Sequence, residues 1–172
     1  APVTGRAVAG RGEPEFAKVG TVAEILEIEP YPDGASDLFT GGSRRFRILK
    51  LVEGKPYLQA EVDYLDEPTG PLTGALRETA CVLATEHARL VAEFTGRMLD
   101  EPYPDDAAQL SYHLAEHTAL APEDKQALLG DPTAAERLQR YVRLMRREIP
   151  LLRQTRTIAV APSLVQLHLR PN

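Results

Sequence analysis

The stretch GTVAEILEIEPYPDGASDLFTGGSRRFRILKLVEGKPYLQAEV, residues 20–62, decides the fold class of this chain. Runs rich in β-branched and aromatic residues alternate there with glycine and proline turn signals, which is typical of strands joined by tight turns. The pattern predicts strands over residues 19–29, 37–40, 44–52 and 57–64. Reversals are expected at Asp33-Gly34, Gly41-Gly42 and Gly54. Because such short turns cannot join parallel neighbours, we expect an antiparallel meander.

The predicted strands carry the alternation of a sheet. In Arg45-Phe46-Arg47 and the residues after it, Phe46 and Ile48 share one face, and we expect them to be core. Along residues 57–64, Leu58 and Val62 point one way and the charged residues point the other.

Helical periodicity begins near residue 68. The first predicted helix has an apolar stripe at helical spacing, formed by Leu76, Ala80, Leu83, His87, Leu90, Val91, Phe94 and Met98. On its surface, Glu86–Arg89 and Glu93–Arg97 have ion-pair spacing. The second predicted helix has the stripe Leu110, Leu114, His117 and Leu120. A third, short helix begins at Pro122 and stops at Gly130.

The fourth predicted helix has two competing starts one turn apart. Asp131-Pro132 is an N-cap with a first-turn proline, and Thr133 with Glu136 has capping-box spacing. Its apolar stripe is Leu138, Tyr141, Val142, Met145 and Ile149. We expect Pro150 to end the helix.

The composition sets limits on the function. The 172 residues suffice for one domain with an appended subdomain. No apolar run approaches the roughly 20 residues of a membrane span, so no membrane partner is expected. The single cysteine, Cys81, excludes an intramolecular disulfide and fits a reducing compartment. The net charge of −5 argues against the whole chain as a nucleic-acid binder.

Two groups of motifs resemble one known family. The first comprises Gly20-Thr21-Val22-Ala23, Asp33-Gly34, Gly42, Arg45-Phe46-Arg47 and residues 57–62. The second comprises Lys125-Gln126-Ala127-Leu128-Leu129 and Arg137-Leu138. Their order and spacing over residues 19–149 resemble the Lon protease N-terminal, or substrate-binding, domain family.

The resemblance implies an α+β fold, with a PUA-like β-half followed by a helical, four-helix bundle-like subdomain. We therefore expect an incomplete β-half over residues 1–67, a helical subdomain over 68–150 and a tail over 151–172. The tail contains the β-like run TIAVAPSLVQLHL. We expect the first strands of the family to be missing from the chain, which begins at Ala1 without Met.

The resemblance also implies a function. Because the sequence has no phosphate-binding loop and no peptidase domain, we expect a stand-alone, non-enzymatic module from a bacterial cytoplasm. It is expected to bind polypeptide segments without catalytic residues, cofactor or metal, and a protease or ATPase acting in trans is left open. Tyr31, Leu38 and Phe39, near loop ends, are the candidate peptide-binding residues. The alternative is that these side chains plug the end of the β-half.

The sharpest chemical motif is His113-Leu114-Ala115-Glu116-His117, which matches the H-x-x-E-H zinc-hydrolase pattern. Two histidines at i and i+4 share a helix face, and Glu116 beside them has the chemistry of a general base. The alternative is a packing helix in which His117 faces the core and bonds a carbonyl. A core role is likewise expected for His87, and a buried thiol for Cys81.

An arginine-rich face offers a third interpretation. Seven arginines fall between residues 137 and 156: Arg137, Arg140, Arg143, Arg146, Arg147, Arg153 and Arg156. Such a face fits nucleic-acid phosphates or an acidic protein. With four Phe, six Tyr and no Trp, aromatic residues for base stacking are scarce, and a solvated helix face is the simpler reading.

Overall fold

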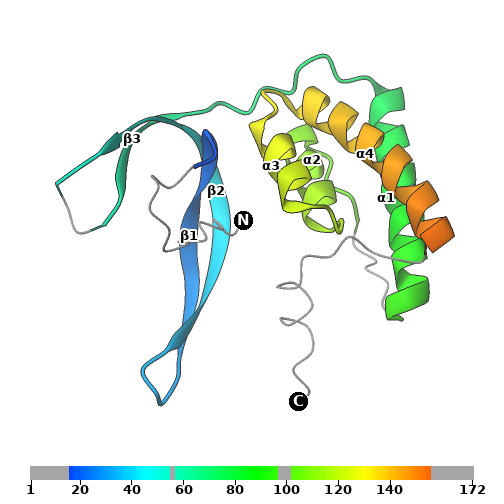
Figure 1. Cartoon of the computed structure of the whole chain (residues 1–172). Coiled ribbons are helices and arrows are strands. Elements are labelled where there is room, and N and C mark those ends of the chain that lie inside the picture. The colour runs from blue at the N-terminus through cyan, green and yellow to red at the C-terminus, as the bar shows by residue number, and fades with distance from the viewer. Residues whose placement is uncertain (1–15, 55–56, 97–101, 156–172) are drawn as a thin grey trace. The chain divides into compact units, whose positions relative to one another are not determined.

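The computed structural model describes residues 16–54, 57–96 and 102–155, which fall into two compact units (Figure 1). The first unit ends at Asp66 and holds the β-strands, and the second begins at Glu67 and holds the helices. The predicted α+β class is confirmed. The β-like run of the tail and the expectations on Arg97 and Arg156 lie outside the described residues.

The sheet is the predicted antiparallel meander. It contains β1 (Val19–Pro30), β2 (Ser36–Val52) and β3 (Gln59–Tyr64) in the order β1-β2-β3. The reversals at Gly34 and Gly54 are confirmed, because these residues have φ of 87° and 112°. Only glycine adopts this left-handed region without steric cost.

The predicted reversal at Gly41-Gly42 is wrong, because β2 runs through both glycines and the described part of the sheet has three strands rather than four. Gly41 pairs with Glu24 and Gly42 pairs with Ala23 of β1. The register shifts just beyond them, where β2 has one residue more than β1. A Cβ at Gly41 would lie 3.3 Å from Cδ1 of Leu26. The glycines therefore serve strand pairing beside a bulge.

The sheet unit has little interior of its own. Phe46 and Ile48, expected in the core, are only half-buried. Arg45, which precedes Phe46 on β2, is buried instead. The Arg45 guanidinium donates to the Asp66 carbonyl at 3.3 Å, and the Arg45 carbonyl accepts from the Leu65 N–H at 3.0 Å. Every buried apolar side chain among the described residues belongs to the helical unit.

The described residues of the helical unit form four helices: α1 (Gly74–Thr95), α2 (Ala107–Glu116), α3 (Pro122–Gly130) and α4 (Ala134–Thr155). Helix α4 packs against each of the other three. The predicted stripe of α4 is confirmed, since all five of its members are buried. The described part of the α1 stripe is likewise buried or half-buried. Among the described helices, none is long and apolar enough to cross a membrane.

The two ends of α4 settle one prediction and correct another. Thr133 Oγ1 accepts the Glu136 N–H at 3.1 Å, so the capping-box start is the one used. At the other end, the helix continues past Pro150 to Thr155. The expected stop fails because Leu152 lies three residues after Ile149, extends the apolar stripe and is buried.

Candidate functional site

The tip of the β1–β2 hairpin is tightly hydrogen-bonded around Tyr31. The Tyr31 N–H donates to the Ala35 carbonyl at 2.8 Å, and its carbonyl accepts from the Gly34 N–H at 3.1 Å. The Tyr31 hydroxyl donates to Oδ2 of Asp37 at 2.6 Å. Tyr31 is therefore half-buried and held at the hairpin tip.

Leu38 and Phe39 are exposed, with 56% and 47% of their surface open to solvent. As neighbours on β2 they point to opposite faces of the sheet. Leu38 pairs directly with Ile28, and Thr40, two residues along β2, pairs with Ile25. Because directly paired residues share a face, Ile25, Ile28 and Leu38 form one exposed apolar row. We call this row the hairpin patch.

Ile25 and Ile28 are binding candidates that the sequence interpretation missed. They are 58% and 55% exposed, as open as Leu38. The pairing register that aligns them with β2 was not deducible from either strand alone, since β1 carries an extra residue between Ile25 and Glu27. On the opposite face, Phe39 pairs with Glu27 and has acidic surroundings.

The backbone beside the hairpin patch is also open. Beside the hairpin patch, residues 25–29 of β1 pair only with β2 among the described residues, so no further described strand lies along their outer edge. An unpaired edge presents N–H and C=O groups to which an extended peptide can add as a further strand. The patch and the edge together have the chemistry of a strand-addition site.

The H-x-x-E-H motif lies at the C-terminal end of α2. The helix ends at Glu116, so His117 leaves the apolar stripe and is exposed, and its expected core-facing position is wrong. The expected carbonyl contact is present, because His117 Nδ1 lies 2.9 Å from the His113 carbonyl oxygen. The two imidazole centroids are 4.2 Å apart. No group of three metal-ligand side chains gathers in the described residues.

Burial shifts the pKa values of the two reactive groups of α1 toward their neutral forms. His87 is buried, and desolvation lowers its pKa, which the Glu148 charge partly opposes. Burial raises the pKa of the half-buried Cys81 thiol, and the Arg77 charge opposes this shift only in part. The environment of Cys81 therefore favours the neutral thiol over the nucleophilic thiolate.

The arginine-rich face of α4 divides into paired and unpaired residues. Arg140 makes two bonds of 2.7 Å to Asp131, Arg147 contacts Asp124 at 2.6 Å, and Arg153 contacts Glu86 at 2.8 Å. Arg143 and Arg146 are exposed, and among the described residues neither has a carboxylate within ion-pair distance.

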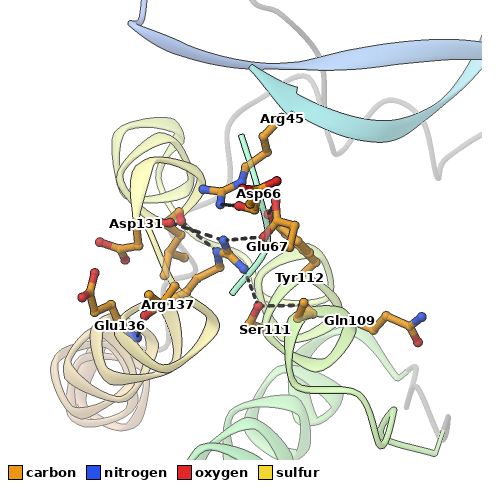
Figure 2. Close-up of polar contacts among 12 residues, drawn as sticks. Arg45, Asp66, Glu67, Gln109, Ser111, Tyr112, Asp131, Glu136 and Arg137 are labelled. Atoms are coloured by element: carbon orange, nitrogen blue, oxygen red, sulfur yellow. Dashed lines mark hydrogen bonds and ion pairs between the residues drawn. The ribbon is translucent and has the colours of Figure 1, made fainter. Parts of the chain in front are cut away.

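Arg137 does not belong to that face, because its side chain is fully buried. Its Nε donates to the Leu128 carbonyl at 3.1 Å and its Nη1 donates to Ser111 Oγ at 2.7 Å. Its Nη2 contacts Glu67 Oε2 at 3.3 Å, and the guanidinium lies 4.0 Å from the Tyr112 ring centroid. Figure 2 shows Glu67, Ser111 and Tyr112 around Arg137.

The Arg137 cluster connects the first residue of the helical unit to α2, α3 and α4. Tyr112 completes it by donating its hydroxyl to Glu67 Oε1 at 2.7 Å. The sequence signal for burial was the position of Arg137 four residues before Tyr141, on the apolar side of the helix. Its polar contacts within the bundle give it a structural role.

The comparisons with known proteins agree on one family. Residues 3–147 match the model of the ATP-dependent protease La (LON) substrate-binding domain. The Lon protease of Escherichia coli (strain K12) is 30% identical over 158 residues, which cover 86% of this chain and 19% of that protein. The Lon protease of Dictyoglomus thermophilum is 28% identical over 142 residues, covering 80% of this chain and 18% of that protein.

Two solved structures share the fold. A Lon N-terminal domain protein from Xanthomonas campestris has a TM-score of 0.56 and 24% identity, with 74% of this chain and 68% of that chain covered. The N-terminal domain of the Mycobacterium avium complex Lon protease has a TM-score of 0.51 and 18% identity, covering 79% and 74%.

This chain spans about a fifth of the length of the curated relatives that it matches, as shown by the 19% coverage of the Escherichia coli protein. The residues of this chain that match the family model, 3–147, include the β-meander, helices α1, α2 and α3, and α4 up to residue 147. The motifs, the α+β fold and the family match over residues 3–147 together show that the chain belongs to the Lon substrate-binding domain family.

Proposed function

We propose that this chain is a non-enzymatic polypeptide-recognition module that holds extended, apolar segments of other proteins at the β1–β2 hairpin. The observation that carries the proposal is the hairpin patch, whose three side chains are each more than half exposed beside a strand edge along which no further described strand lies. Membership of a family named for substrate binding supports it.

In this form of polypeptide binding, the backbone and the side chains contribute differently. The outer edge of β1 beside the hairpin patch supplies hydrogen bonds that align an incoming strand without regard to its sequence. The hairpin patch supplies affinity, because covering one exposed aliphatic side chain is worth about 1.5–3 kcal/mol. Tyr31, whose hydroxyl is bonded to Asp37, stabilises the conformation of the hairpin tip. Phe39 offers an aromatic contact on the sheet face opposite the hairpin patch.

In this function the chain itself has no catalytic activity. Protease or ATPase activity, where the function requires it, would be supplied in trans within the cytoplasm. The raised pKa of the Cys81 thiol counts against a nucleophile at this position.

The test measures binding of a reduced, alkylated and therefore permanently unfolded protein. Replacing Ile28 and Leu38 together by Ser, or Leu38 and Phe39 together by Ser, should weaken binding by about 1–3 kcal/mol, the scale for losing apolar anchors. Fluorescence anisotropy of the labelled ligand gives the Kd.

The matched control is Val82→Ser. Val82 is 60% exposed but lies on α1 in the helical unit, so its loss should leave the Kd unchanged. Equal weakening by the hairpin variants and by Val82→Ser would show that the contact is non-specific, and the hairpin would then not be the binding site.

A further inference from the structure

A groove of about 370 Å³ runs between the first half of α1 and the middle of α4. It lies entirely within the helical unit and is separate from the hairpin patch. The residues that line it and matter here are Leu76, Thr79, Gln139, Val142, Arg143 and Arg146. The groove therefore combines an apolar floor with two cationic side chains.

The two groove arginines differ from their neighbours on α4. Each of three neighbours forms an ion pair with a carboxylate of this chain: Arg140, Arg147 and Arg153. Arg143 and Arg146 are three residues apart on one helix, and no described carboxylate neutralises them. Like charges at this spacing repel one another, so an anionic ligand bound between them relieves an existing repulsion.

We propose that this groove binds acidic polypeptide segments, with Arg143 and Arg146 pairing to carboxylates and Leu76 and Val142 receiving an apolar side chain between them. The inference rests on the proposed function and adds a second site with its own sequence preference. Guanidinium groups bind carboxylates bidentately, which fixes the spacing of the acidic residues as well as their charge.

Single-stranded nucleic acid fits the same arginines less well. Among the described residues that line the groove, none has an aromatic side chain on which a base can stack. The chain carries a net charge of −5, which opposes a polyanion more than a peptide with a few carboxylates. The uncharged part of the lining, with Leu76 and Val142, also favours a peptide side chain.

The experiment uses the full chain and a short rhodamine-labelled peptide of alternating Glu and Leu, with a second peptide in which each Glu is Gln. Binding is measured by anisotropy at low and at physiological salt, since exposed ion pairs are screened as salt rises. The groove variant is Arg143→Gln with Arg146→Gln. The matched control is Arg147→Gln with Arg153→Gln, which removes the same charge from paired residues of the same helix.

The groove variant should bind the Glu–Leu peptide about tenfold or more weakly than the parent does. The control variant should lose less than about threefold in affinity for the same peptide. The Gln peptide should bind the parent about tenfold more weakly. Equal weakening by both double variants, or equal affinity for both peptides, would overturn the proposal. So would a short single-stranded RNA that binds the parent more tightly than the peptide and loses affinity in the groove variant.

The same measurements separate this inference from the proposed function. The groove variant should bind the unfolded apolar protein as well as the parent does, whereas the Leu38 and Phe39 variant should keep its affinity for the Glu–Leu peptide. If the unfolded protein binds at the hairpin but the acidic peptide does not bind, the groove proposal fails alone. If the acidic peptide binds and the hairpin variants have no effect, the hairpin proposal fails alone.

Discussion

Replacing Arg137 by Met should remove a large part of the stability of the helical unit. Arg137 is fully buried and donates to the Leu128 carbonyl, Ser111 Oγ and Glu67. Methionine keeps much of the aliphatic volume but has no donor. Two of the acceptors lie at positions that are at most 1% exposed, so water cannot easily replace the lost bonds.

The magnitude follows from which partners are left without a donor. Ser111 can still donate to the Ala108 carbonyl at 2.7 Å, and the Glu67 side chain is 33% exposed and can be hydrated. The Leu128 carbonyl keeps the Asp131 N–H at 3.3 Å but loses its bond from Arg137 at a buried position, and the Asp131 carbonyl loses its bond of 3.4 Å from Arg137 Nη2; together these losses cost about 1–3 kcal/mol. Because the Glu67 carboxylate can be hydrated, the substitution leaves no buried charge uncompensated, and we expect a total loss of about 1–3 kcal/mol.

The assay is urea unfolding followed by far-UV circular dichroism at the helix band. The midpoint should fall with an unchanged dependence on denaturant, because the surface exposed on unfolding stays the same. Arg143→Met is the control on the same helix, and its exposed position predicts a change within about 0.5 kcal/mol. A loss below about 1 kcal/mol for Arg137→Met, or a similar loss for the control, would refute the reasoning.

Two further predictions concern a helix cap and a pH response. Thr133→Ala removes the cap of α4 and should lower the free energy of unfolding by about 1 kcal/mol in urea; an unchanged midpoint would contradict the observed start. The guanidiniums of Arg89 and Arg153 lower the pKa of Glu86 to about 2, below its unfolded value of about 4.3. The unfolded chain therefore takes up the proton first, so this stabilisation is complete above pH ~4.3 and is lost as pH falls toward ~2. Glu86→Gln should flatten this part of the stability–pH curve, and an unaltered curve would show that Glu86 does not contribute.

Much of the fold could be predicted because its signals are local. The turns at Gly34 and Gly54 follow from the left-handed φ that the chain needs there, and the apolar stripe of α4 follows from helical spacing. The choice between the two starts of α4 was left open, since Asp131 and Thr133 are both good caps. The structure resolves it, because Asp131 is engaged by Arg140 and Thr133 caps the helix.

The candidate site was predicted only in part. The sequence pointed to Leu38 and Phe39 as loop-end apolar residues, and both are exposed. It could not show that Leu38 shares a face with Ile25 and Ile28, because that depends on pairing across the hairpin and on the bulge in β1. The sequence also showed the arginines of α4. It could not show which of them form ion pairs with carboxylates that are distant in the sequence.

The sequence by itself determined the α+β class, the order of the elements and the positions of most turns, because propensity, capping and periodicity act over a few residues. Tertiary structure decided the burial of Arg137, the passage of β2 through Gly41-Gly42 and the continuation of α4 past Pro150. In each case a partner distant in sequence outweighs the local preference: Glu67 for Arg137, the pairing strand β1 for the glycines, and the packed core around Leu152 for the helix.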